Sequence, residues 1–132
     1  MKKMIAALAL SMAFLFCLSA CGKYHSHYSA TAFVHSNESD HAFMNFWIFE
    51  GTMVFKLKCQ DADEAIAYTA KLETGSATVY YDCGDGKKEL CAVNAGDEVQ
   101  STLDGLTPGT VYIIVETDGE CRTGDFQFDI KR

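Results

Sequence analysis

The chain has 132 residues, which is the length of one domain after a short targeting segment and is enough to bury a core. Eleven Lys and Arg residues stand against 18 Asp and Glu residues, so the formal net charge is −7. Binding to the phosphate backbone of a nucleic acid needs clustered Lys and Arg side chains, and this acidic chain has no basic stripe. The composition therefore argues against a nucleic-acid partner.

The first twenty residues have the organisation of a secretion signal. Lys2 and Lys3 precede an uncharged, mostly apolar run from Met4 to Leu18. A short positive segment followed by an apolar run of this length is typical of a signal peptide. The run is shorter than the roughly 20 apolar residues that a membrane span needs. We therefore expect residues 1–20 to be a signal peptide.

A motif for lipid attachment follows the apolar run. Leu18-Ser19-Ala20-Cys21 resembles the lipobox of bacterial lipoproteins, in which an aliphatic residue and two small residues precede the modified cysteine. The resemblance implies a diacylglyceryl group on Cys21, and two acyl chains anchor a protein to a membrane far more stably than one. It therefore implies a lipid-anchored protein on the extracytoplasmic face of a cell membrane. An ordinary cleaved signal and an uncleaved anchor are the alternatives.

Beyond the signal, apolar and polar residues alternate along most of the chain. A period of two is typical of half-buried β-strands. It runs through residues 52–59, 66–73, 78–82, 99–103, 111–116 and 126–131. Turn sequences that contain glycine separate these segments at intervals of roughly 8 to 12 residues, the rhythm of an antiparallel sandwich. We therefore expect an all-β fold, a single antiparallel β-sandwich of about seven or eight strands over residues 42–132, with residues 21–41 as a tether.

Parts of this pattern are similar to a known group of proteins. The segments in question are 49–51, 68–75, 78–82, 108–115 and 124–128. Together they resemble small bacterial lipoproteins with a compact, jelly-roll-like β-sandwich domain of uncharacterised function. The resemblance implies a fold and a location, and it implies no catalytic residue.

Four of the six cysteines belong to the β domain, because Cys17 lies in the signal and Cys21 carries the lipid. They are Cys59, Cys83, Cys91 and Cys121. An even number of cysteines in an exported domain favours disulfides. The alternative is four reduced thiols that pack as small apolar side chains.

The expected strand arrangement suggests how these four cysteines pair. Cys83 and Cys91 flank the Asp-Gly turn at residues 85–86. Cys59 ends one strand and Cys121 precedes the last, so the two meet if those strands pair antiparallel. We therefore predict one bridge between Cys59 and Cys121 and another between Cys83 and Cys91.

No catalytic motif accompanies the strands. The chain has no GxSxG elbow, HExxH motif, P-loop or dinucleotide fingerprint. Residues 83–87 hold two glycines, but they lack the spacing and the Ser or Thr of a phosphate loop, and Asp-Gly is typical of a hairpin turn. We therefore expect a non-catalytic domain that needs no cofactor.

One strand does not alternate. Residues 43–49 are apolar on both faces except for Asn45, as expected of a central strand that is covered on both sides. The alternative is that an outward side chain, Phe46 or Trp47, contacts a partner or stacks on a sugar ring. Our first hypothesis is therefore a membrane-anchored accessory or binding domain for an envelope protein, a glycan or a wall component.

The histidines support a second hypothesis. All four lie within one short stretch, at His25, His27, His35 and His41. His25 and His27 lie on the same side of an extended chain, and imidazoles with nearby carboxylates are ligands for zinc or copper. An extracytoplasmic metal-binding lipoprotein is therefore the alternative function. A solvated tether beside the lipid is the simpler interpretation of the same segment.

Overall fold

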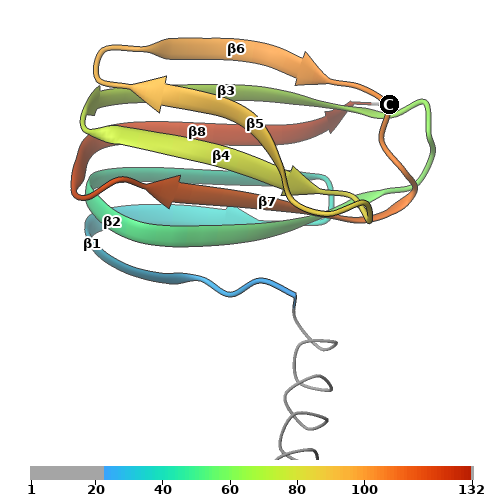
Figure 1. Cartoon of the computed structure of the whole chain (residues 1–132), viewed down its shortest axis with the longest axis horizontal. Coiled ribbons are helices and arrows are strands. Elements are labelled where there is room, and N and C mark those ends of the chain that lie inside the picture. Colours follow the sequence, from blue (N-terminus) through green and yellow to red (C-terminus); the bar gives the residue numbers. More distant parts are fainter. Residues whose placement is uncertain (1–22, 132) are drawn as a thin grey trace, which may run out of the picture.

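The structure is a computed structural model that describes residues 23–131. Within these residues it contains eight antiparallel strands and no helix, and hence no helix that could span a membrane (Figure 1). The strands are β1 (His27–Asn37), β2 (His41–Cys59), β3 (Ala65–Thr74), β4 (Ser76–Asp82), β5 (Lys88–Asn94), β6 (Glu98–Leu103), β7 (Gly109–Thr117) and β8 (Cys121–Lys131). The predicted all-β, antiparallel fold is confirmed. The signal peptide and Cys21 lie outside the described residues.

Six of the strands form three longer ribbons that each bend once. β3 continues into β4, β5 into β6 and β7 into β8, and the three connections lie together at the left end of Figure 1. β2 is a single strand that runs through the same bend. Its residues 41–49 pair with β8, and its residues 52–59 pair with β7. The bend divides the sheet into two layers. The first layer holds β1, the first half of β2, β8, β3 and β6, and the second holds the rest of β2, β7, β4 and β5.

The core lies between the two layers. Phe55 of the second layer and Phe128 of the first have ring centroids 6.0 Å apart. The other large, fully buried side chains alternate along the strands of both layers and include Met44, Phe49, Leu57, Ile66, Leu72, Ile113 and Phe126. Burying one such side chain stabilises a fold by about 1.5 to 3 kcal/mol. The period-two pattern therefore produces the sandwich by giving each layer one apolar face.

Glycines make the bend possible. Gly51 has a φ of +130°, and a β-carbon there would collide with the backbone oxygen of His27. Gly75 has a φ of +96°, and its β-carbon would lie 2.7 Å from Sγ of Cys121. Only glycine combines this backbone conformation with so little space.

The structure extends the domain beyond the predicted boundary at residue 42. The segment that we expected to be a tether contains β1, which pairs with residues 42–52 of β2. The ring of Phe33 lies 5.4 Å from that of Phe49, so β1 covers part of the core. The two strands expected on either side of Gly51 are also one continuous strand.

Neither predicted disulfide agrees with the strand register, and Cys59 and Cys121 are far apart. Cys59 lies opposite Gly109, whereas Cys121 lies opposite Phe49, ten positions away along β2. The last strand pairs with the first half of β2, not with the half that ends at Cys59. The premise of the predicted pairing was therefore wrong.

Cys83 and Cys91 are also too far apart to form a bridge. Cys91 lies opposite Val79, which is four positions from Cys83 along the chain. Four extended residues span about 13 Å, whereas a disulfide needs α-carbons within about 7 Å. All four domain cysteines are free thiols. Burial, with a smaller contribution from the charge of Glu89, raises the pKa of Cys91 to about 11, so this thiol is protonated at neutral pH.

Candidate functional site

The outer face of the first layer carries an ordered array of side chains, all of them polar except Phe43. The strand registers place Asn45, Asp125, Lys71 and Glu98 in one row across β2, β8, β3 and β6. A second row follows, formed by Phe43, Gln127, Thr69 and Gln100. Side chains opposite one another on adjacent strands are about 5 Å apart. We call these eight residues the polar platform.

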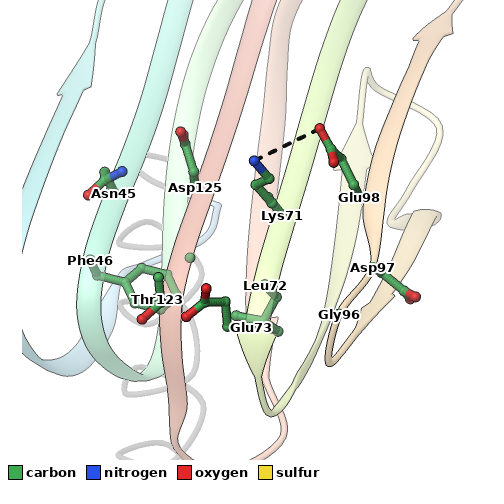
Figure 2. Close-up of a pocket in the computed structure, with 11 residues that line it drawn as sticks. Asn45, Phe46, Lys71, Leu72, Glu73, Gly96, Asp97, Glu98, Thr123 and Asp125 are labelled. Carbon is green, nitrogen blue, oxygen red and sulfur yellow. Dashed lines mark ion pairs between the residues drawn. The ribbon is translucent and has the colours of Figure 1, made fainter.

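A groove opens in the platform where the first layer approaches the bend. Figure 2 shows Asn45, Asp125, Lys71 and Glu98 side by side along the groove. All four residues line this hollow, which has a volume of about 490 Å³. Lys71 Nζ lies 3.9 Å from Glu98 Oε1, and both side chains are largely exposed. Such an exposed pair contributes little to stability. These amide, carboxylate and ammonium groups are therefore free to exchange solvent contacts for contacts with a ligand.

The groove continues along the same strands. A second hollow of about 530 Å³ is lined by residues of β3, β6 and β8, among them Thr69, Gln100 and Gln127. Amides and hydroxyls both donate and accept hydrogen bonds. Together the two hollows offer a long, shallow site for a polar, extended ligand.

Trp47 stands at the edge of this groove. Its side chain is 54% exposed. Phe46 pairs with Gly124 and Ile48 with Arg122, so Trp47 lies level with Thr123, which lines the groove. An exposed indole beside polar groups provides an apolar surface at the margin of a polar site.

Trp47 points outward as the alternation of β2 requires, and the alternation breaks immediately after it. Phe46 and Phe49, three positions apart, both enter the core. On the neighbouring strands Ala32 and Thr123, at the same level, have φ values of 50° and 51°. A left-handed conformation costs a residue other than glycine about 1 to 2 kcal/mol, and such strain concentrates at functional sites.

The structure exposes one of the two residues that the sequence suggested as a partner surface and buries the other. Trp47 is exposed, whereas Phe46 is 3% exposed and its ring lies under Gly124. The expectation of a central strand covered on both faces was wrong at Asn45 and Trp47, because both side chains are exposed and none of residues 23–131 covers them. The sequence did not reveal the polar platform. Its members lie on four strands, and the order of those strands in the sheet cannot be read from the sequence.

The structure separates the histidines. His27 and His35 lie near opposite ends of β1, and eight extended residues span about 26 Å. His35 stacks on Phe33 with ring centroids 4.6 Å apart, and His41 pairs with Asp129. Residues 23–131 contain no group of three or more His, Cys, Asp or Glu side chains that could hold a metal ion. The four histidines therefore do not form one site.

No protein-family model and no curated protein matches the chain. Among solved structures, TmCBM61 in complex with β-1,4-galactotriose has a TM-score of 0.47 and 16% identity, over 81% of this chain and 88% of that chain. A family 29 carbohydrate-binding module has a TM-score of 0.40 and 15% identity, over 80% and 75% of the two chains. The Drosophila melanogaster CENP-C cupin domain has a TM-score of 0.33 and 11% identity, over 81% and 76%. Similarity at this level assigns the chain to no family.

Proposed function

We propose that this chain is the non-catalytic, glycan-binding domain of a lipoprotein that Cys21 anchors on the extracytoplasmic face of a membrane. The observation that carries the proposal is a 54% exposed Trp47 beside a groove of polar side chains. The ligand is a glycan of the cell envelope or its surroundings, bound along the polar platform.

The chemistry of the groove favours an uncharged glycan. A sugar ring presents C–H groups on its faces and hydroxyls around its rim. The C–H face suits the indole of Trp47, and the hydroxyls suit amides and carboxylates such as Asn45, Gln127 and Asp125. The carboxylates of Asp125 and Glu98 would repel the phosphate or sulfate groups of a charged glycan. Lys71 is the one residue of the same row that could attract such groups.

The arrangement of the carboxylates favours binding rather than hydrolysis. A glycosidase holds two carboxyl groups on either side of the bond that it cleaves. Here Asp125 and Glu98 stand in one row on the outer face of one layer, with Lys71 between them. That geometry presents both to the same side of a ligand.

Trp47 fluorescence provides the test, because it is the only tryptophan in the chain. The purified protein is titrated with neutral polysaccharides and defined oligosaccharides, and binding should change the Trp47 emission. Trp47→Ala should weaken binding at least about tenfold, the equivalent of about 1.4 kcal/mol, as measured by calorimetry, while Trp47→Phe keeps part of the affinity.

Two lysines form a matched pair of controls. Lys71→Ala, within the groove, should weaken glycan binding, whereas Lys58→Ala, on the other layer, should not. Equal affinity of the wild type and Trp47→Ala for every bound glycan, or capture of an envelope protein with no glycan binding, would overturn the proposal.

The anchor needs a separate test. Cys21→Ser removes the sulfur that would carry the lipid, so the variant should leave the membrane fraction of cells that express the full chain. A variant that stays in the membrane fraction after processing would contradict the lipoprotein assignment without affecting the glycan result.

A further inference from the structure

A buried carboxylate on the second layer holds the beginning of the described chain. Asp82 is 1% exposed, and its carboxylate accepts hydrogen bonds from Tyr24 Oη at 2.7 Å and from the backbone N–H groups of Gly84 at 2.8 Å and Gly86 at 3.2 Å. Lys23 Nζ forms an ion pair with it at 2.7 Å. Burial and the bond to Asp82 raise the pKa of Tyr24 to about 12, so its hydroxyl remains a donor at physiological pH.

Other contacts hold residues 23–26 across the outer face of the second layer. The ring of Tyr24 meets that of Tyr112 on β7 edge-on, with centroids 5.2 Å apart. The hydroxyl of Ser26 accepts a hydrogen bond of 2.8 Å from the backbone N–H of Val54 on β2. The folded domain therefore includes residues 23–26, and we call Lys23, Tyr24 and Asp82 the N-terminal clamp.

The clamp leaves almost no chain between the fold and the proposed lipid. Cys21 is two residues from Lys23, and two residues span at most about 7 Å. A flexible tether would instead let the domain turn freely above the membrane. The clamp thus restricts where the anchor can lie, namely beside the outer face of the second layer.

We propose that the domain lies directly against the bilayer, with the outer face of the second layer on the lipid headgroups and the polar platform facing away from the membrane. The proposal rests on lipidation of Cys21. It follows from the opposite positions of the clamp and the platform on the two layers of the sandwich.

The charges on the two faces agree with this orientation. The outer face of the second layer carries Lys23, Lys56, Lys58 and Lys87 against Asp82, Glu89 and Glu116, of which Asp82 and Glu116 are paired with Lys23 and Lys87. The outer face of the first layer carries Glu73, Glu98, Asp125 and Asp129 against Lys71 and Lys131. Lysines close to a bilayer are attracted to anionic headgroups, and carboxylates are repelled. Anionic phospholipids are therefore the partner that the second layer favours.

Tryptophan quenching by lipid measures the orientation. The lipidated full-length protein is reconstituted in vesicles of anionic phospholipids with brominated acyl chains. Trp47 reports on the platform, and a Trp47→Phe, Thr110→Trp double variant reports on the second layer, where Thr110 is exposed opposite Lys58. We expect lipid quenching to be at least threefold stronger for the double variant, and quenching by aqueous iodide to show the reverse order.

A variant with an inserted linker distinguishes the effect of the clamp from that of membrane attachment alone. About 20 Gly and Ser residues inserted after residue 22 add roughly 25 Å of flexible reach, so the difference in quenching between the two reporters should disappear. Lys23→Ala combined with Tyr24→Phe should reduce that difference, whereas Lys131→Ala combined with Tyr28→Phe, with the lysine on the face turned away from the membrane, should retain it.

Each further outcome has one meaning. Equal quenching of both reporters in the lipidated wild type would overturn the orientation while leaving the lipoprotein assignment intact. A protein that carries no lipid and stays out of the vesicles would overturn both. Glycan binding, measured in solution, is independent of either result.

Discussion

Asp82 keeps its negative charge in an almost fully buried position because its partners outweigh the cost of burial. Burial alone would raise the pKa of Asp82, but the ion pair with Lys23 and the hydrogen bonds from Gly84, Tyr24 and Gly86 hold it well below the ordinary value. An unfolded Asp takes up its proton near pH 4, whereas folded Asp82 stays ionised to lower pH. The clamp therefore stabilises the fold fully above about pH 4 and loses that contribution as the pH falls further.

We expect Asp82→Asn to change the acid dependence of stability. Unfolding by urea at pH 7 should show a loss of about 1 to 3 kcal/mol, because a charged hydrogen-bond acceptor is removed. Between pH 5 and pH 3 the wild type should lose stability more steeply than the variant. Asp85→Asn, in the neighbouring turn, should keep the wild-type slope, and parallel slopes for the wild type and Asp82→Asn would contradict the pKa assignment.

The exposure of Trp47 leads to a second prediction at the residue scale. Replacing a core tryptophan with alanine costs about 3 to 5 kcal/mol, but surface substitutions usually cost less than about 0.5 kcal/mol. Trp47→Ala should therefore unfold at nearly the wild-type urea concentration, whereas Phe46→Ala should lose several kcal/mol. The wild-type emission should be red-shifted and accessible to iodide. A blue-shifted, protected Trp47 would place the side chain in the core.

At the scale of elements, β2 and β8 meet in a contact that leaves no room for a side chain. A β-carbon on Gly124 would collide with the ring of Phe46, and the φ of Gly124 lies outside the left-handed region that only glycine favours. The glycine is thus required by packing rather than by backbone conformation. It lets the aromatic ring reach the core beneath the groove.

Gly124→Ala should therefore destabilise the domain by about 1 to 3 kcal/mol, the cost of overpacking. Phe46→Leu should destabilise it too, but the double variant should be more stable than the sum of the two changes predicts. Urea unfolding of all four proteins gives this coupling energy. Strict additivity would show that Phe46 is not what excludes a side chain at residue 124.

At the scale of the whole molecule, the domain includes the segment before residue 42. The ring of Tyr28 stacks 5.1 Å from Phe49 and that of Phe33 lies 5.4 Å from it. A protein that begins at Ala42 loses β1 and exposes this aromatic cluster and one edge of β2. A protein that begins at Lys23 keeps both.

We therefore expect the shorter protein to be unfolded or to aggregate, and the longer one to unfold cooperatively in urea. A third protein that begins at His27 lacks Lys23 and Tyr24 of the clamp and the Ser26 contact, and it should fold with reduced stability. Near-ultraviolet circular dichroism and urea midpoints compare the three. Equal midpoints for the proteins that begin at Lys23 and Ala42 would restore the boundary predicted from the sequence.

The sequence by itself determined the fold class and most of the strands. Along residues 66–73 or 111–116 the period of two states which side chains share a face, and burial of that face needs no knowledge of the strand's partner. A pattern for secretion and lipid attachment is equally local, since it is contained in residues 1–21. The absence of alternation in β1 hid that strand, which is defined by its pairing with β2.

Only the tertiary structure decided which strands are neighbours, and the site depends on that order. The polar platform brings together Asn45, Lys71, Glu98 and Asp125 from four strands, and no local pattern marks them as one surface. The separation of Cys59 from Cys121 also depends on which strands are neighbours. A glycine at a bend and a glycine in a hairpin look alike in sequence, but they send the chain to different layers. Pairing of distant strands is a non-local choice, made by the total burial of both layers, and a period-two pattern does not contain it.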